Sequence, residues 1–277
     1  MYSEKLIKQL EDKVVEIKRK ILDMIYNAQS GHLGGSFSAA DIAVCLYYHH
    51  MNIDPANPGW DDRDRFILSK GHAAPLLYAI LADKGYFPEE KLKDFRQIDS
   101  ILPGHPDINK TPGIDMTCGS LGQGLSVGIG LALGARQNNQ NYRTYVLMGD
   151  GELNEGQVWE AAMFANKEKI SNLVAIVDYN KVQLDGSCNK IMPMSPLKDK
   201  WKAFGWRVIE INGHNVSEIL KALDWAEQIT DSPVVIIADT IKGKGVSFME
   251  NNHKWHGNPP SNEEYKKALM ELKRSRV

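Results

Sequence analysis

An aspartate flanked by two glycines, Gly149-Asp150-Gly151, directly follows the apolar run 145–148. A carboxylate is a hard oxygen ligand of the kind Mg²⁺ prefers, and Mg²⁺ usually shares its coordination shell with phosphate oxygens. Gly151 would let the backbone approach such a phosphate. A helix expected from Glu155 would add an N-terminus that favours anions. Taken alone, the tripeptide is more often a turn whose aspartate caps a helix.

A second oxygen ligand, Asn180, follows the next apolar run, 173–178. Its neutral amide, together with the Asp150 carboxylate, could hold a divalent cation and leave coordination positions free for a ligand. Both side chains come where a predicted strand ends, and ligands of open α/β sheets bind at the carboxyl ends of the strands. The pair therefore predicts a cation and phosphate site at this edge.

Four histidines, His32, His72, His105 and His253, lie beside glycines or in short loops. An imidazole can take or give a proton near neutral pH, which suits acid–base chemistry. Each histidine taken singly is more often a helix cap or a surface residue. His253 and His256 could instead chelate zinc, although no cysteine or third ligand lies near them in the sequence.

The elements that would position these groups alternate along the chain. Strands are expected at 142–148, 173–178, 206–211 and 233–239, and helices at 155–169, 196–205 and 216–229. The strands are continuous apolar runs, which predicts an α/β protein with a parallel sheet covered by helices on both faces. Right-handed crossovers would make the sheet doubly wound.

Helices are also expected in the first half of the chain, at 6–27, at 38–51 with Ser38 as its N-cap, at 72–86 closed by Gly85, and at 121–137. The last of these contains five glycines, which lower helix propensity. We therefore expect another part of the structure to approach the helix 121–137 closely.

The composition is that of a globular protein: 277 residues, 43% hydrophobic and 25% charged, with a net charge of −2. This charge gives no electrostatic case for nucleic acid or an anionic membrane. Three widely spaced cysteines favour reduced thiols. The N-terminus resembles no signal peptide, and no run reaches the roughly 20 apolar residues of a membrane helix. We expect a single domain, 1–277, in the cytoplasm.

The Gly-Asp-Gly tripeptide, followed by a helix, a strand and Asn180, resembles the thiamine diphosphate-binding motif, with Tyr179 in place of its first terminal asparagine. Further segments are similar to the transketolase family, in family order and over most of the chain. They are SGHLGGSFSAAD (30–41), LSKGHAAPLLYA (68–79), LPGHPD (102–107), GSLGQGLSVGIGLALGAR (119–136), GDGELNEGQVWEA (149–161), DYNKVQLDG (178–186) and HKWHG (253–257). The resemblance implies the thiamine diphosphate-binding fold.

The resemblance also implies a role for each residue that matches a family motif. Asp150, the Asn180 side chain and the Val182 carbonyl would hold Mg²⁺ or Ca²⁺. Gly151, His72 and His253 would contact the diphosphate, with Gly119, Ser120 and Leu121 near the junction of the cofactor rings. Glu155 is expected beside the cofactor and, with Glu160, at a subunit interface. His253 and His32 would move protons, His105 would hold the two-carbon fragment, and His72 would mainly organise the cofactor.

Proteins of the transketolase family contain three domains in a row, and this sequence resembles only the first of them. The pyrimidine-binding and C-terminal domains are therefore expected on a partner chain, in an α2β2 heterotetramer. The expected activity is transfer of a two-carbon ketol unit from a ketose phosphate to an aldose phosphate, by default in pentose phosphate metabolism.

Three alternatives remain open on the sequence. The chain could be the α-subunit of a 2-oxoacid decarboxylating enzyme, although that pattern lacks the GHPD and SKGHAAPLLYA segments. It could belong to a transketolase dedicated to an unusual pentose. It could also be a non-catalytic scaffold, against which the intact motif and histidines argue. Deoxyxylulose-phosphate synthase, a related enzyme, is normally one long chain.

Overall fold

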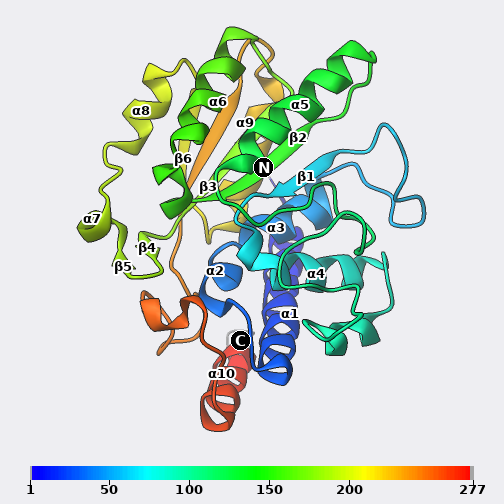
Figure 1. Cartoon of the computed structure of the whole chain (residues 1–277), viewed down its shortest axis with the longest axis vertical. Helices are drawn as coiled ribbons and strands as arrows, with labels where there is room; N and C mark the ends of the chain where they lie inside the picture. The colour runs from blue at the N-terminus through cyan, green and yellow to red at the C-terminus, as the bar shows by residue number, and fades with distance from the viewer. Residues whose placement is uncertain (1, 275–277) are drawn as a thin grey trace.

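A parallel sheet forms the centre of the computed structural model, which describes residues 2–274 (Figure 1). Among these residues its strands follow the order β1 (Arg65–Leu68), β2 (Thr144–Gly149), β3 (Leu173–Tyr179), β7 (Val234–Asp239) and β6 (Arg207–Asn212). Every neighbouring pair is parallel. The four predicted strands are confirmed, and β1, with only four residues, was not predicted.

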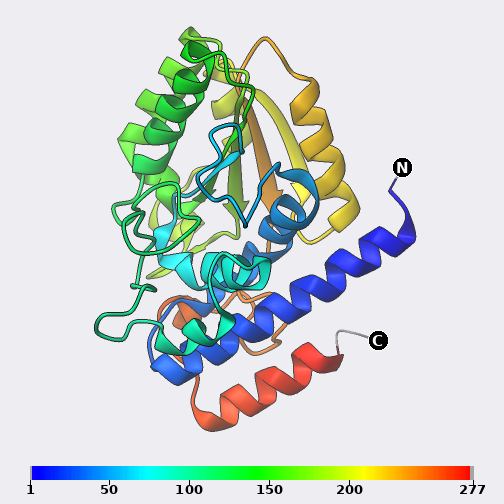
Figure 2. The ribbon, with the colours of Figure 1, turned by 90° about the vertical axis from the view of Figure 1, so that its right-hand side faces the viewer.

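Helices cover both faces of the sheet, as predicted (Figure 2). The strand side chains alternate between two buried clusters: Tyr145 and Leu147 of β2 join one, and Val146 and Met148 join the other. The first cluster includes α1 (Glu4–Ala28), α3 (Ala40–Cys45), α4 (Ala74–Lys84) and α9 (Val216–Gln228). The second includes α5 (Gln123–Gln137), α6 (Gly156–Lys167) and α8 (Leu197–Ala203). These two apolar layers make the sheet a rigid support.

Helix α1 packs along the first layer, and α10 (Asn262–Arg274) lies beside it (Figure 1). The Ser3 hydroxyl accepts a hydrogen bond from the Leu6 amide and starts α1, as is typical of an N-cap. The rings of Tyr26 and Tyr265 stack 4.1 Å apart and join the two helices. Helix α10 was not predicted from the sequence.

The remaining described elements are short. Apart from those within 33–50, they are η2 (Gly71–Ala73), η3 (Glu89–Asp94), η4 (Gly151–Asn154), β4 (Val182–Gln183), β5 (Gly186–Ser187), α7 (Cys188–Ile191) and η5 (His253–His256). Strands β4 and β5 pair antiparallel as a small hairpin. Cys45, Cys118 and Cys188 are buried free thiols. Within residues 2–274, no helix combines the length and apolar character needed to cross a membrane.

A helix was predicted over 38–51, and the chain is helical over 40–50, where α3 continues directly into a π-helical turn, η1 (Leu46–His50). The prediction of Ser38 as the N-cap was wrong, because Ser38 belongs to a separate preceding helix, α2 (Leu33–Ser38). Ser38 ends α2, and its hydroxyl donates to the buried Asp178 carboxylate over 2.6 Å. This tertiary partner replaces the local N-cap contact. The prediction of Gly85 as the end of α4 is confirmed: it adopts φ 88°, in the left-handed region that favours glycine.

The glycines of α5 divide between two faces. A Cβ atom on Gly128 would lie 2.5 Å from Val146 Cγ2, and one on Gly124 would lie 2.4 Å from Ser69 Cβ. Those two glycines therefore let the helix sit directly on β2 and on the end of β1. A Cβ atom on Gly130 or Gly134 would meet nothing within 4 Å. The sheet of the same chain therefore makes the close approach to α5 that was expected from the sequence, and it does so on one face of the helix.

These two faces predict opposite effects of the same substitution. Gly128→Ala forces a methyl group into packed strand side chains and should destabilise the chain by about 1–3 kcal/mol. Gly130→Ala gains helix propensity without a clash and should stabilise it by about 0.5–1 kcal/mol. Urea unfolding of both variants measures the difference. A stabilised Gly128→Ala variant would contradict the packing described.

Candidate active site

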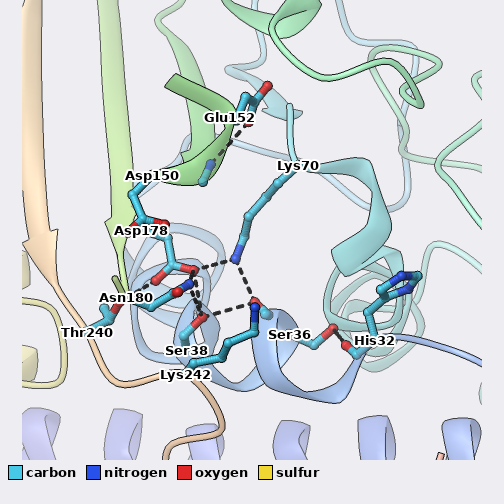
Figure 3. A network of polar contacts seen from close by, with 12 residues as sticks. His32, Ser36, Ser38, Lys70, Asp150, Glu152, Asp178, Asn180, Thr240 and Lys242 are labelled. Carbon is cyan, nitrogen blue, oxygen red and sulfur yellow. Dashed lines mark hydrogen bonds and ion pairs between the residues drawn. The ribbon is translucent and has the colours of Figure 1, made fainter. Parts of the chain in front are cut away.

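Residues at or just after the carboxyl ends of β1, β2, β3 and β7, among them Lys70, Asp150, Asn180 and Lys242, lie together at one edge of the sheet (Figure 3). The strand register pairs Gly149 with Asp178 and Asp178 with Ala238, so the residues that follow β2, β3 and β7 come out side by side. A cavity of about 300 Å³ opens at this edge. Its lining comprises Gly35, Lys70, His72, Leu121, Gly149, Asp150, Gly151, Glu152, Asn154, Glu155, Asn180, Val182, Gln183, Leu184, Lys242 and His256.

Asp150 is buried, with 3% of its surface exposed. Backbone amides hold its carboxylate: Oδ1 accepts from Gly151 N over 2.9 Å, and Oδ2 accepts from Lys181 N over 2.6 Å. Burial and the nearby Asp178 charge raise the pKa of Asp150 to about 6. A bound cation would favour the ionised form of this carboxyl group.

Asn180 and Val182 line the same cavity as Asp150, so the structure brings the three predicted metal ligands together. Asn180 Nδ2 donates to Asp178 Oδ2 over 2.9 Å, which leaves its Oδ1 to accept from Val182 N over 3.1 Å. Among residues 2–274, no group of three His, Cys, Asp or Glu side chains could hold a metal ion. A cation here would therefore need mixed carboxylate, amide and carbonyl oxygens, and the His253–His256 zinc alternative lacks a ligand set.

A buried ion pair lies below the cavity, and sequence analysis missed it. Lys70 Nζ lies 2.5 Å from Asp178 Oδ2 and donates to the Gly35 carbonyl over 2.6 Å. The Asp178 carboxylate also accepts from the hydroxyls of Ser38 and Thr240. Burial raises the pKa of Asp178, but the Lys70 ammonium and these hydrogen bonds outweigh burial and keep its pKa below the usual value. Only the KGH sequence after a short strand could have signalled Lys70.

A second buried lysine, Lys242, was also missed. Its Nζ donates to the Val182 carbonyl over 2.9 Å and lies 2.7 Å from His256 Nδ1. Burial and repulsion from Lys70 lower the pKa of Lys242 to about 8. Within the described chain, no carboxylate forms a salt bridge with it. This ammonium group therefore suits an anionic ligand in the cavity.

Glu152 braces the turn after β2. Its carboxylate accepts from Gly122 N over 2.8 Å and Gly149 N over 3.1 Å, and it also accepts from the Ser69 hydroxyl. These contacts join the ends of β1 and β2 to the start of α5. Sequence analysis gave this acid no role, because Gly122 and Ser69 are distant from it in the chain.

Three histidine rings gather beside the lysines. The ring centroids lie 5.1 Å apart for His32 and His72, 5.0 Å for His72 and His256, and 5.4 Å for His32 and His256. Burial lowers the pKa of His32 to about 4 and that of His256 to about 3, and lowers the pKa of His72 well below its ordinary value. All three rings are therefore neutral at pH 7. His32 Nδ1 is buried and has no hydrogen-bond partner in the described chain, and His32 does not line the cavity.

The structure places His256, and not His253, in this cluster. His253 is exposed at the first position of η5 and does not line the cavity. The buried Trp255 anchors the turn, and Lys242 holds the neighbouring His256 ring. The motif HKWHG contains both histidines, and its spacing alone did not distinguish them. His105 is exposed on a loop, where its carbonyl accepts from the Tyr78 hydroxyl over 3.0 Å.

The other predicted cofactor contacts are partly assembled. Gly151, Leu121 and Glu155 line the cavity. Gly119 and Ser120 are exposed on the adjoining loop and do not line it. Glu160 is exposed on α6. A larger, open hollow of about 500 Å³ lies next to β6, but its lining contains no lysine, so it does not compete as an anion site.

The buried neutral histidines predict a pH dependence of folding. Unfolded histidine binds a proton below about pH 6.5, whereas folded His32 does so only near pH 4. His32 should therefore make the free energy of unfolding fall as the pH drops from 6.5 to 4. Asp150, whose pKa is raised to about 6, acts in the opposite direction in part of this range.

The comparison of His32→Asn with the unsubstituted chain isolates the histidine contribution. The variant should lose less stability between pH 6.5 and pH 4, measured as the urea midpoint at each pH. If the urea midpoints of the variant and of the unsubstituted chain changed equally with pH, His32 would not be held neutral in the folded protein.

The fold and the cavity define an α/β protein with a candidate anion site at the carboxyl edge of a parallel sheet. Residues 10–273 match the family described as "Transketolase, thiamine diphosphate binding domain". The 6-deoxy-6-sulfo-D-fructose transketolase subunit of Clostridium sp. (strain MSTE9) is 47% identical over 93% of this chain and 94% of its own length. One subunit of the apulose-4-phosphate transketolase of Phocaeicola vulgatus is 40% identical over 96% of this chain and 94% of its own length.

Solved structures agree with this match. The transketolase of Campylobacter jejuni superposes with a TM-score of 0.90 at 37% identity, over 96% of this chain and 43% of that one. This chain belongs to the transketolase family. It is an N-terminal, thiamine diphosphate-binding subunit of that family. It spans 40% of the length of human transketolase, to which it is 40% identical. The match favours a transketolase over the 2-oxoacid decarboxylating alternative.

Proposed function

We propose that this chain, with a partner subunit, transfers a two-carbon ketol unit from a ketose phosphate to an aldose phosphate. One observation carries the proposal: oxygen ligands, buried lysines and two neutral histidines, His72 and His256, line a single cavity, and the His32 ring lies against both histidines. The oxygen ligands and lysines suit a metal-bound diphosphate, and the histidines suit proton transfer with a sugar.

The donor set fits thiamine diphosphate with Mg²⁺ or Ca²⁺. The Asp150 carboxylate, the Asn180 amide oxygen and the Val182 carbonyl would hold the cation, which takes oxygen ligands and shares its shell with phosphate. Lys242, which lacks a carboxylate partner in the described chain, and Lys70 would offset the diphosphate charge. Gly151 and His72 line the same cavity and would contact the diphosphate.

Thiamine diphosphate, when bound, supplies the carbon nucleophile and the electron sink that cleavage of a ketose needs. The residues of this chain would handle the protons. We assign removal of the hydroxyl proton to His32 and His256, because both rings are partly buried and neutral at pH 7. His256 takes the role first expected of His253. His105 would hold the hydroxyl of the two-carbon fragment, and His72 would organise the cofactor.

Three variants of the two-subunit enzyme test these roles. Asp150→Ala should abolish cofactor-dependent ketol transfer, because the cation loses its only carboxylate in the proposed set. His256→Ala should lower kcat/KM by about 10²–10⁴-fold, the usual contribution of a general base. His253→Ala serves as the matched control from the same turn and should stay within a few-fold of the unsubstituted enzyme. A scaffold subunit would leave all three variants fully active.

The names of the relatives bear on which sugar the enzyme would act on. Two of them are named for unusual sugars, 6-deoxy-6-sulfo-D-fructose and apulose-4-phosphate. Both of those sugars carry an anionic group. We therefore favour a donor or acceptor with an anionic terminus, either in pentose phosphate metabolism or in the breakdown of a less common sugar. Buried free thiols support a reducing, cytoplasmic location.

We also propose that residues 1–277 form a single domain, and that a partner chain brings the pyrimidine-binding and C-terminal domains in an α2β2 assembly. Helices α5 and α6 lie side by side, joined where Gln123 and Gln157 exchange hydrogen bonds. Their outer face exposes Val127, Met163 and Phe164 next to the open glycines of α5. An exposed apolar face of this kind, with Glu160 upon it, supports a subunit interface.

A charge on this face should disrupt assembly. Met163→Glu and Phe164→Glu should shift the co-expressed enzyme from a heterotetramer towards separate chains in size-exclusion chromatography with light scattering. Met270→Glu, at an apolar position with similar exposure on α10, is the control and should leave the assembly intact. Unchanged mass in all three variants would place the interface elsewhere.

A further inference from the structure

We infer that His214, held by Asp41, is a positioning residue that sets the place of Lys242 in the diphosphate end of the cavity. The inference rests on the proposed role of Lys242. His214 lies in the turn between β6 and α9 and belongs to none of the motifs that point to the cofactor. It does not line the cavity itself, so it would act through the backbone next to Lys242.

Three side chains, those of Lys18, Asp41 and His214, form a chain of contacts that ends at the backbone amide before Lys242. His214 Nε2 accepts a hydrogen bond from the backbone amide of Ile241 over 2.8 Å. His214 Nδ1 lies 3.1 Å from Asp41 Oδ2, and Lys18 Nζ lies 3.2 Å from the same oxygen. Asp41 is 8% exposed and comes from α3, while Lys18 is 4% exposed and comes from α1. The first helix is thereby linked to the residue before Lys242.

The partners also fix the tautomer of the ring. A backbone N–H can only donate, so Nε2 must present a lone pair to Ile241. The neutral ring then carries its proton on Nδ1, where the Asp41 carboxylate accepts it. Burial raises the pKa of Asp41, but Lys18 and His214 outweigh burial and keep its pKa below the usual value. The ring is therefore held from both sides in one orientation.

The loop that leaves β7 is held on both sides of Ile241 by backbone contacts. Thr240 N donates to the Tyr179 carbonyl over 3.2 Å, and Gly243 N donates to the Gly34 carbonyl over 3.1 Å. Between them, the amide of Ile241 depends on the His214 side chain. Lys242 has little room to adjust, because a Cβ atom on Gly34 would lie 2.9 Å from Lys242 Cγ. A shift at Ile241 should therefore move the Lys242 ammonium away from the Val182 carbonyl and His256.

A matched pair of substitutions separates the two contacts of the ring. His214→Gln can place an amide oxygen near the position of Nε2 and still accept from Ile241. His214→Asn places its amide near Nδ1, where it can donate to Asp41 but cannot reach Ile241. In the two-subunit enzyme with Mg²⁺, His214→Asn should raise the Kd of thiamine diphosphate about tenfold, as expected for loss of one buried hydrogen bond. His214→Gln should raise it less than threefold, with kcat at saturating cofactor within about twofold in both.

A double-mutant cycle with Lys242→Met distinguishes positioning from general stability. In the Lys242→Met background, His214→Asn should change the Kd by less than twofold, because the lysine that it positions is gone. His50→Asn is the control. The His50 side chain is 6% exposed and lies 3.3 Å from Glu227, so this variant removes a buried imidazole from elsewhere and should leave the Kd unchanged. Hydrogen exchange of the Ile241 amide should accelerate in His214→Asn but not in His214→Gln.

The outcomes separate the inference from the proposed function. If Lys242→Met leaves the Kd of thiamine diphosphate unchanged, the diphosphate role of Lys242 is wrong and the inference fails with it. If Lys242→Met weakens binding but His214→Asn weakens it equally in both backgrounds, only the inference fails. Equal Kd values and equal exchange rates for His214→Gln and His214→Asn would also overturn it.

Discussion

The buried ion pair between Lys70 and Asp178 is the interaction on which the site depends. Two charges removed from water are costly unless their remaining hydrogen bonds are satisfied. Here the partners come from four segments: the Gly35 carbonyl and the hydroxyl of Ser38 from α2, the hydroxyl of Thr240 after β7, and the pair itself after β1 and within β3. Any shift of one segment leaves a charge uncompensated, so the pair fixes the base of the cavity.

The two lysines at the cavity differ in whether a carboxylate neutralises their charge. Lys70 is neutralised by Asp178, whereas Lys242 has no such partner in the described chain, so one positive charge is available to a diphosphate beside the oxygen ligand Asp150. Lys70 and Lys242, together with burial, keep His72 and His256 neutral. The same positive charges that suit the cofactor thus prepare imidazoles that can accept protons. In the proposed function, diphosphate binding and proton transfer would therefore both depend on these two lysines.

The surfaces around the cavity explain why a family member can be divided between chains. The site on this chain rests on contacts within one sheet and its own helices, so the proposed metal and diphosphate ligands need no second domain to bring them together. The apolar outer face of α5 and α6 and the exposed His105 loop are the parts that would gain partners. The relatives named as subunits match nearly all of this chain, in agreement with that division.

Apolar runs and the polar residues that end them are local patterns, so the sequence alone predicted the parallel sheet, its two helical layers and the position of Asp150 and Asn180 at one edge of the sheet. The sequence did not predict strand β1, which is too short to show periodicity. It also did not predict the hydrogen bond that Ser38 donates to a carboxylate distant in the chain. It could not choose His256 over His253, which share one motif. The Lys70–Asp178 pair joins residues 108 positions apart. Only the tertiary structure decides such contacts, because they depend on how the strands pair and not on what is nearby in the chain.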